Sequence, residues 1–173
     1  MQGWPHIRNG EHTLICAPTG SGKTLTSFLS AIDSLTTNPR PEGRSLRTRV
    51  LYLSPLRALA FDIEKNLRAP LKGIEFAAER LGESFVVPEV GMRTGDTPAN
   101  DRQKLIRRPP DLLITTPESL YLMCTSTARE TLVGVKTVII DEIHAMAATK
   151  RGAHLMLTLE RLEEITEKPP QRI

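Results

Sequence analysis

The sequence of 173 residues has few of the features that mark secreted, membrane or metal-stabilised proteins. Its two cysteines, Cys16 and Cys124, lie far apart without metal-ligand spacing, so neither a disulfide framework nor a zinc site is expected. Cys16 lies in an apolar run and is predicted to be a buried small hydrophobe. The first residues do not form a signal peptide, and no apolar stretch approaches membrane-spanning length. These absences favour an intracellular, reducing compartment, and the expected location is the cytoplasm.

Aromatic residues are also scarce, at 4% of the chain, whereas 39% is hydrophobic and 25% is charged. This is the composition of a soluble globular protein, and the length suits one domain with a sizeable core. The net charge of +3 is compatible with a polyanionic partner, but many proteins that never touch nucleic acid are as basic. The segment Asn38–Arg49, rich in proline, glycine and arginine, is predicted to be an exposed loop. Its arginines are either solvated, the favoured reading, or in contact with phosphates.

Short apolar runs alternate with amphipathic patterns along the chain. Strands are expected at His12–Ala17, Arg49–Ser54, Pro88–Arg93, Asp111–Thr115 and Lys136–Asp141. Helices are expected at Lys23–Leu35, Leu56–Leu67, Leu71–Leu81, Asn100–Ile106, Pro117–Cys124 and Arg151–Ile165. Several strands are nearly continuous Val, Ile and Leu, as expected when helices cover both faces of the sheet. The pattern predicts an α/β fold with a mostly parallel sheet, whose ligands lie outside the carboxyl ends of the strands.

The segment APTGSGKT resembles the phosphate-binding P-loop pattern G-x-x-x-x-G-K-[ST]. Ala17 replaces the first glycine, while Gly22, Lys23 and Thr24 match. An expected strand precedes the segment and an expected helix follows it, which is the setting that this chemistry needs. Backbone N–H groups and the helix N-terminus would bind phosphate oxygens, Lys23 would reach the β- and γ-phosphates, and the Thr24 hydroxyl would bind Mg²⁺. The other reading is a glycine-rich turn with a surface lysine. The expected phosphate-binding residues are Ala17, Pro18, Thr19, Gly20, Ser21, Gly22, Lys23 and Thr24, and the expected ligand is a nucleoside triphosphate.

Two adjacent carboxylates, Asp141 and Glu142, end the apolar run Thr137–Ile140. In P-loop enzymes a strand-end aspartate holds Mg²⁺ and its neighbour can orient the attacking water. A magnesium ion would also offset the repulsion between the two charges. The pair alone is a weak signal, because acidic residues at a helix start give the same pattern. Together with the P-loop it predicts Asp141 as the Mg²⁺ holder and Glu142 as the general base.

Five segments in this order resemble motifs I, Ia, the TGD segment, Ib and II of superfamily 2 helicases of the DEAD/DEAH type. They are APTGSGKT, SPLRALA (Ser54–Ala60), TGDT (Thr94–Thr97), TTPESL (Thr115–Leu120) and DEIH (Asp141–His144). The DEIH box, GWP (Gly3–Pro5) and KRGAHL (Lys150–Leu155) are most similar to the large helicase-related (Lhr) family. The resemblance implies a RecA-like P-loop NTPase domain in a motor that uses ATP and Mg²⁺ to move along nucleic acid, either single-stranded DNA or RNA or a DNA–RNA hybrid.

The same resemblance implies a strand-binding face, where hydroxyls, an arginine and loop N–H groups suit phosphate contacts of any base sequence. The residues implied are Ser54, Pro55, Leu56, Arg57, Thr94, Gly95, Asp96, Thr116 and Pro117. Ser54 and Thr116 also suit helix N-caps, with proline at the first helical position. His144 is implied to couple the nucleotide site to the nucleic-acid site.

Other parts of the family pattern fall outside the sequence. The glutamine that reads adenine would precede Met1, and Gln2 is not in its register. Pro170–Ile173 resembles the lead-in to motif III, and the second RecA-like domain with its arginine finger is absent. Residues 1–173 are therefore interpreted as a first RecA-like domain, a fragment of a longer protein. Because an arginine finger contributes about 10³–10⁵ in rate, the isolated chain is expected to bind Mg·ATP weakly at best and to unwind nothing.

Two alternatives remain at this stage. The motor could translocate on double strands or remodel complexes without separating the strands. It could instead be a P-loop ATPase or kinase acting on proteins or metabolites, but nothing in such an enzyme requires the ordered set SPLRALA, TGDT and TTPESL.

Overall fold

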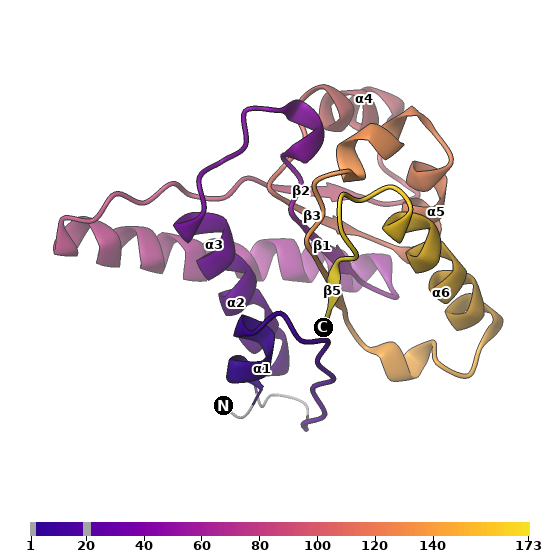
Figure 1. The fold of residues 1–173 in the computed structure, drawn as a ribbon, viewed down its shortest axis with the longest axis horizontal. Coiled ribbons are helices and arrows are strands. Elements are labelled where there is room, and N and C mark those ends of the chain that lie inside the picture. The colour runs from indigo at the N-terminus through magenta and orange to yellow at the C-terminus, as the bar shows by residue number, and fades with distance from the viewer. Residues whose placement is uncertain (1–2, 19–21) are drawn as a thin grey trace.

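The computed structural model of the chain describes residues 3–18 and 22–173. Within these residues, five parallel strands form one sheet in the order β2-β3-β1-β4-β5 (Figure 1). The strands are β1 (Val50–Leu53), β2 (Val90–Arg93), β3 (Leu112–Thr115), β4 (Thr137–Ile140) and β5 (Gln171–Arg172). Leu53 pairs in register with Thr115 on one side and with Ile140 on the other. The carboxyl ends of the central strands therefore meet at one edge of the sheet.

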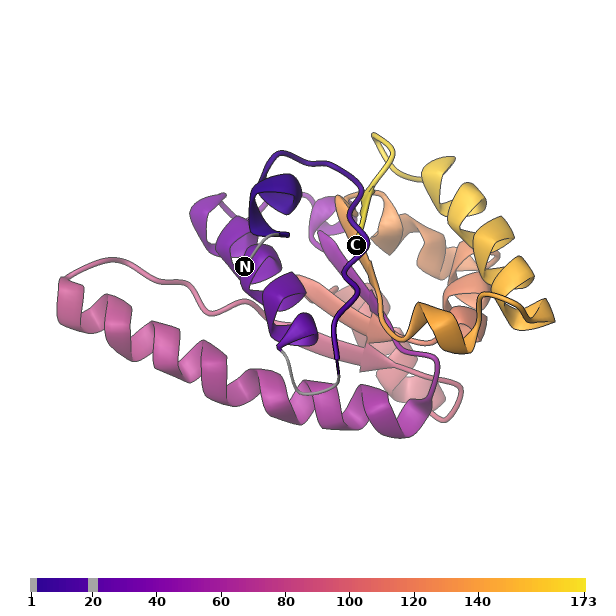
Figure 2. The ribbon, with the colours of Figure 1, turned by 90° about the horizontal axis from the view of Figure 1, so that it is seen from below.

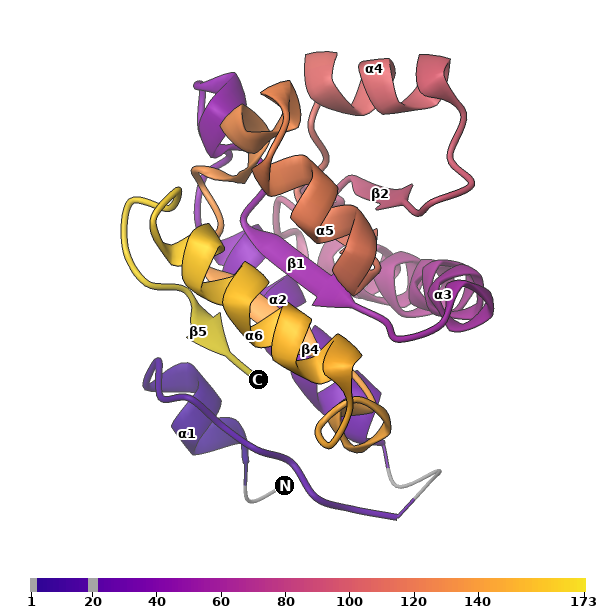
Figure 3. The ribbon, with the colours of Figure 1, turned by 90° about the vertical axis from the view of Figure 1, so that its right-hand side faces the viewer.

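Helices cover both faces of this sheet, which confirms the predicted architecture. Figure 3 shows α5 and α6 on one face, with α2 and α3 on the opposite face. The α-helices are α1 (Trp4–Arg8), α2 (Lys23–Thr37), α3 (Arg57–Leu81), α4 (Ala99–Arg107), α5 (Pro117–Cys124) and α6 (Lys150–Glu163). Short 3₁₀ turns are η1 (Arg44–Leu46), η2 (Thr127–Leu132) and η3 (Ile143–Ala145). Helix α1 and strand β5 were not predicted from the sequence.

The core consists of two apolar layers, one on each side of the sheet. Alternate strand residues such as Leu51 and Leu53 face α5, η2 and α6, whereas Val50 and Tyr52 face α2 and α3. The apolar residues of α2 recur at a spacing of three and four, which places one stripe of the helix against the sheet. That stripe consists of Phe28, Ala31, Ile32 and Leu35. Because both faces are covered, the central strands β1 and β3 are buried along their whole length.

The two helices expected at 56–67 and 71–81 form one continuous helix, α3, with Pro70 in its interior (Figure 2). A proline inside a helix removes one backbone hydrogen bond and usually interrupts the helix. Here Leu67 and Leu71, on either side of it, are both buried in the same core layer. Asn66, whose carbonyl loses its partner to the proline, is exposed and can bind water instead. The expected division into two helices, 56–67 and 71–81, is therefore wrong.

The strand expected at His12–Ala17 is also absent, because residues 11–18 belong to neither a helix nor a strand. The segment lies beside β5, where the Thr13 N–H donates to the carbonyl of Arg172 (3.0 Å). Strand β5 contains two residues and offers little backbone for a further ladder. As a result Leu14 is 73% exposed. Cys16 is exposed as well, so its predicted burial is wrong.

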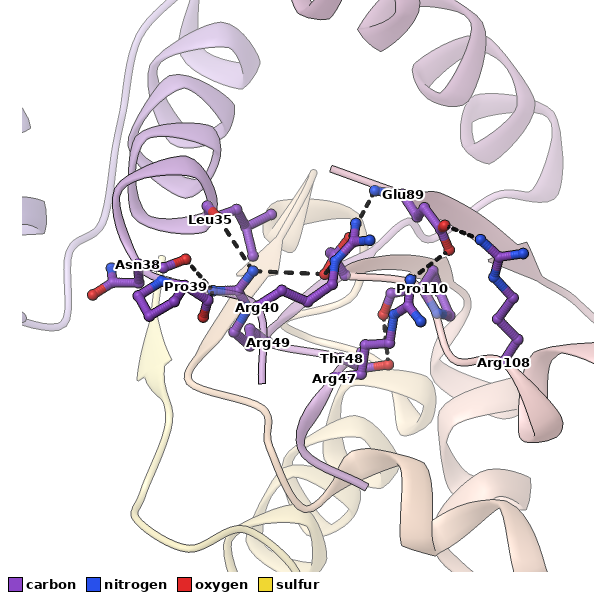
Figure 4. A network of polar contacts seen from close by, with 11 residues as sticks. Leu35, Asn38, Pro39, Arg40, Arg47, Thr48, Arg49, Glu89, Arg108 and Pro110 are labelled. Carbon is purple, nitrogen blue, oxygen red and sulfur yellow. Dashed lines mark hydrogen bonds and ion pairs between the residues drawn. The ribbon is translucent and has the colours of Figure 1, made fainter. Parts of the chain in front are cut away.

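Residues 38–40 and 42–44 of the segment 38–49 are exposed, as predicted, but Arg40, Arg47 and Arg49 contact the body of the domain and are not simply solvated (Figure 4). Arg49 is buried and donates to the carbonyls of Leu35 (3.2 Å) and Asn38 (3.2 Å). Arg40 and Arg49 both face the Asp111 carboxylate, and Arg40 Nε lies 3.1 Å from Asp111 Oδ1. These residues lie where the strands begin, at the end of the sheet opposite the predicted phosphate site.

A second set of contacts extends this network. Arg47 and Arg108 both pair with Glu89, at 2.9 and 2.5 Å, and the Glu89 N–H donates to Asp111 (2.8 Å). The network thus joins the chain before β1 to the chain before β2 and β3.

Among the described residues, no helix combines the length and apolar character that crossing a bilayer requires.

Candidate functional site

A cleft of about 90 Å³ opens at the carboxyl end of β4, between the start of α2 and η3. Its walls come from five separate parts of the chain. The polar residues that line it are Lys23, Thr24, Ser27, Tyr52, Asp141, Glu142 and His144. The predicted phosphate-binding cation and the predicted catalytic carboxylates therefore share one cavity. Thr19, Gly20 and Ser21 of the predicted phosphate loop lie outside the described residues.

The start of α2 has the features of an anion-binding helix end. Gly22 precedes the helix with φ +86°, a left-handed conformation that glycine adopts without the strain of a side chain. No described side chain caps the first N–H groups, and the first turn holds no acidic residue. Lys23 and Thr24 open the helix and are half-buried, while Ala17 is half-buried and Pro18 is exposed. The free N–H groups, the helix dipole and Lys23 all favour a bound anion.

Asp141 is held by hydrogen bonds at both of its carboxylate oxygens. The Tyr52 hydroxyl donates to Oδ2, and the backbone N–H of Glu142 donates to Oδ1 (2.9 Å). Tyr52 is fully buried in β1 and stacks on Phe28 of α2, with ring centroids 4.8 Å apart. Burial raises the pKa of the Tyr52 hydroxyl, and the nearby Asp141 carboxylate raises that pKa further, so Tyr52 is a neutral donor. The orientation of Asp141 is therefore fixed before any ligand binds.

Glu142 has an unusual backbone conformation for a residue with a side chain, with φ 50° and ψ 41°. This turn ends β4 and begins η3, where the Ala145 N–H donates to the Glu142 carbonyl (2.8 Å). Left-handed non-glycine residues are strained by about 1 kcal/mol or more and are concentrated at functional sites. The turn places the Glu142 side chain in the cleft, 3.2 Å from His144 Nε2. The His144 side chain is 76% exposed.

The donor set fits a magnesium ion better than it fits a transition metal. Among the described residues there is no group of three or more His, Cys, Asp or Glu side chains that could hold a metal. Magnesium is usually bound through one or two carboxylates, with water and substrate phosphates completing its octahedron. The Thr24 hydroxyl and the Asp141 carboxylate line the same cleft. A carboxylate has about four lone-pair positions, so Asp141 keeps free positions after accepting two hydrogen bonds.

The residues of the predicted strand-binding face follow β1, β2 and β3 at the same edge of the sheet. Several of them are buried. Ser54 donates to the Leu56 carbonyl (2.9 Å), and Thr116 caps α5 by accepting from Ser119 N–H. Ser54, Pro55, Thr94, Thr116 and Pro117 are buried, whereas Leu56, Arg57, Gly95 and Asp96 are exposed. The exposed part of the predicted face is therefore formed by two loops.

One ion pair joins these two loops, and hydrogen bonds from α4 hold the second loop in place. Arg57, at the start of α3, pairs with Asp96 of the other loop at 2.5 Å. Arg102 of α4 donates to the carbonyl of Gly95 (2.7 Å) and to that of Thr97 (2.7 Å). The neighbouring Arg93 is buried, and its Nη1 has no partner among the described residues. Burial lowers the pKa of Arg93, and the positive charge of Arg102 lowers it further. The edge is thus rich in guanidinium groups.

Comparison with known proteins identifies the family. The family model described as DEAD/DEAH box helicase matches residues 1–173. The chain belongs to the DEAD/DEAH box helicase family. Its relatives within that family include Lhr proteins, as the sequence motifs predicted. A protein of Mycolicibacterium smegmatis named Lhr helicase/probable uracil glycosylase is 59% identical over 98% of this chain, and the Lhr helicase/uracil glycosylase of Escherichia coli is 56% identical over 99%.

The fold of this DEAD/DEAH box domain matches a solved Lhr structure. The structure of Mycobacterium smegmatis helicase Lhr bound to ssDNA and AMP-PNP aligns over 99% of this chain with a TM-score of 0.92 and 58% identity. The predicted RecA-like fold is therefore confirmed. The chain corresponds to 21% of that structure and to 11% of each of the two curated relatives.

Two residues of this DEAD/DEAH box domain were not singled out as site residues from the sequence. Tyr52 places a hydroxyl inside an apolar strand. A buried hydroxyl needs a hydrogen-bond partner, and this need is the sequence signal that could have pointed to Asp141. Arg151 belongs to KRGAHL, a segment that resembles the Lhr family but whose sequence pattern implies no role for this residue. It lies in the first turn of α6, where a cation is unfavourable for the helix dipole.

Proposed function

We propose that this domain is the ATP-binding part of an ATP-dependent nucleic-acid helicase, which unwinds or moves along DNA or RNA–DNA duplexes. The observation that carries the proposal is one shared edge of the sheet. There the cleft with Lys23, Thr24, Asp141 and Glu142 lies beside the loops that follow β1, β2 and β3. The relative bound to single-stranded DNA and AMP-PNP supports the same assignment.

Within this function the residues of the cleft have separate roles. Residues 17–24 bind the phosphates, with Lys23 as the mobile cation for the terminal phosphates. Thr24 and Asp141 hold Mg²⁺, which offsets phosphate charge when bound. Glu142 accepts a proton from the attacking water, because its carboxylate lines the cleft and has only His144 as a polar partner among the residues that the structure describes. Tyr52 keeps Asp141 in one orientation.

The strand-binding role belongs to the loops at the same edge. Ser54, Pro55, Leu56 and Arg57 follow β1, Thr94, Gly95 and Asp96 follow β2, and Thr116 and Pro117 follow β3. Exposed Arg57 and the N–H groups of the loops supply contacts to phosphates, and the buried threonines hold these loops in shape. His144 couples the two sites through its contact with Glu142.

Two further parts of the proposal concern the whole protein. We infer that a second RecA-like domain of the same protein completes the catalytic site, since this chain corresponds to about a fifth of the related solved structure. A cytoplasmic location is supported by the scarcity of cysteine. The alternative is a translocase that moves along double strands without separating them. It uses the same cleft and differs only in the nucleic acid that it binds.

The proposal is tested on the full-length protein. ATP hydrolysis is expected to rise when single-stranded DNA or RNA is added, and unwinding is measured with 3′- and 5′-tailed DNA and RNA–DNA duplexes. Stimulation by single strands together with unwinding supports the helicase. Stimulation by duplex alone supports the translocase, and no stimulation by any nucleic acid contradicts both.

Lys23→Ala is expected to weaken binding of the nucleoside triphosphate by about 10- to 100-fold, because one charge-assisted contact to the terminal phosphates contributes about 1.5–3 kcal/mol. Titration with a fluorescent ATP analogue measures the change. Lys65→Ala removes an exposed lysine of α3 and serves as the matched control. Equal affinities for the two variants would contradict the phosphate role of Lys23.

Tyr52→Phe is expected to raise the Mg²⁺ concentration needed for half-maximal nucleotide binding by about 10-fold, because groups that orient a metal ligand typically contribute that much to affinity. The ring keeps its stacking on Phe28. Nucleotide binding in EDTA should not change. Tyr121→Phe, at the other tyrosine of the chain, is the control. A Mg²⁺ dependence equal to that of the control would show that Tyr52 has no role in orienting Asp141.

A further inference from the structure

Arg151 connects three segments that the sequence keeps far apart. Its Nε donates to Glu118 Oε1 (2.5 Å), and its Nη2 donates to the Pro55 carbonyl (2.7 Å) and to Glu118 Oε2 (3.2 Å). Pro55 belongs to the loop after β1, and Glu118 lies in the first turn of α5, directly after Thr116 and Pro117. One guanidinium therefore joins two of the three loops of the proposed strand-binding face.

Hydrogen-bonded turns connect the same arginine to the nucleotide side. The chain from Glu142 to α6 is a series of tight turns, in which Ala145 N–H donates to Glu142, Ala147 N–H to Ile143 and Thr149 N–H to Met146. Thr149 then caps α6 by accepting from Gly152 N–H (3.2 Å). The turns between the catalytic carboxylates and Arg151 thus leave little freedom for independent movement.

Gly152 strengthens this link through close packing. A Cβ at this position would lie 2.2 Å from the Met146 carbonyl oxygen, so only glycine allows the turn to pack on the helix start. Met146 itself is buried in the core layer beneath α5 and α6. A displacement of the segment Asp141–Met146 must therefore move the first turn of α6, and Arg151 with it.

The position of Arg151 has an energetic disadvantage that packing does not explain. Lys150 and Arg151 place two cations at the positive end of α6, and the first turn holds no acidic residue. The Arg151 side chain is 44% exposed, so it is not required to fill the core. The hydrogen bond to Glu118 raises the pKa of Arg151. A local disadvantage of this kind is typical of residues kept for function.

We propose that Arg151 is a positioning residue that couples nucleotide binding in the cleft to binding of the nucleic-acid strand. It acts by joining the turn after Glu142 to the Pro55 carbonyl and to Glu118. The inference rests on the proposed helicase function. It adds to that function a coupling residue and the contacts through which the residue connects the two sites. Among the described residues, the one polar side-chain contact of His144 is with Glu142, whereas Arg151 connects α6 to the strand-binding loops directly.

The test measures coupling in the full-length protein. The coupling factor is the dissociation constant for single-stranded DNA without nucleotide, divided by its value with a non-hydrolysable ATP analogue. By thermodynamic reciprocity, the DNA must change the affinity for the analogue by the same factor. Arg151→Ala is expected to lower the factor by about 5-fold or more, because coupling between sites typically spans about 5- to 150-fold. ATP hydrolysis without nucleic acid should stay at the wild-type rate.

Two further variants make the test specific. Lys150→Ala removes the neighbouring exposed charge and should leave the coupling factor unchanged. Arg151→Lys keeps the charge but loses the forked contact, so its factor should be intermediate. A factor for Arg151→Ala equal to that of Lys150→Ala overturns the inference. Should thermal melting show that Arg151→Ala does not fold, Glu118→Gln replaces it, and an unchanged factor in that variant overturns the inference as well.

Failure of the proposed function gives a different result. A wild-type protein whose ATP hydrolysis is not stimulated by any nucleic acid contradicts the helicase itself. A wild-type protein with normal stimulation, together with an Arg151→Ala variant that couples normally, contradicts only the role of Arg151.

Discussion

Replacing Glu142 with glutamine is expected to lower nucleic-acid-stimulated ATP hydrolysis by about 10²- to 10⁴-fold, the contribution expected of a general base. Glutamine keeps the size and shape of the side chain but cannot accept the proton of the attacking water. Because the Asp141 carboxylate accepts from the backbone N–H of residue 142 and not from its side chain, the substitution leaves that contact in place. The variant should therefore bind Mg·ATP as well as the wild type does.

Steady-state ATP hydrolysis with saturating single strands measures the first effect, and titration with a fluorescent nucleotide measures the second. Glu130→Gln makes the same charge change at an exposed residue of η2 and should hydrolyse ATP normally. Wild-type turnover by Glu142→Gln would remove this residue from the mechanism. Loss of nucleotide binding would instead show that Glu142 supports the ligand site and is not simply a base.

The largest expected effect on stability is that of Asp111→Ala. Its carboxylate is fully buried and accepts from Arg40 and from the Glu89 N–H, with Arg49 Nη2 3.6 Å away. Burial lowers the pKa of Arg49, while the Asp111 charge opposes that shift. Removing the carboxylate leaves a buried cation without its counter-charge, which costs about 3–5 kcal/mol. That is a large part of the roughly 5–15 kcal/mol by which domains are stable.

Urea unfolding followed by circular dichroism gives the free-energy difference. Glu130→Ala breaks the exposed pair with Arg44 (3.4 Å) and is the matched control, because exposed pairs contribute about 1 kcal/mol or less. Asp111→Asn should lie between the two, since an amide oxygen can still accept from Glu89. An Asp111→Ala midpoint no lower than that of Glu130→Ala would show that Arg49 finds sufficient partners in the carbonyls of Leu35 and Asn38.

The sheet was predictable wherever a strand is buried on both faces. β1, β3 and β4 are short runs of Val, Ile, Leu and Thr, with Tyr52 added in β1, and their register brings Asp141 to the edge as expected. The expected strand at 12–17 has a similar apolar pattern but only β5 beside it, so the pattern alone overestimates its pairing. Local pattern does not show which neighbour a strand will have.

The parts of the site that the sequence did not reveal depend on distant contacts. Tyr52 and Asp141 are separated by 89 positions, Pro55 and Arg151 by 96, and Arg40 and Asp111 by 71. No spacing rule relates such pairs. The motifs therefore predict which residues carry charge or hydroxyls at the edge of the sheet, whereas the partners that orient those groups are set by the packing of the whole domain.

In this domain, residues for stability and residues for ligand binding lie at opposite ends of the sheet. Arg49, Glu89 and Asp111 precede β1, β2 and β3, while Ser54, Thr94 and Thr116 follow the same strands. Substitutions that raise or lower the melting temperature can therefore accumulate at one end without altering the chemistry at the other. A domain arranged in this way can adapt to growth at different temperatures while its proposed ligand-binding loops stay the same.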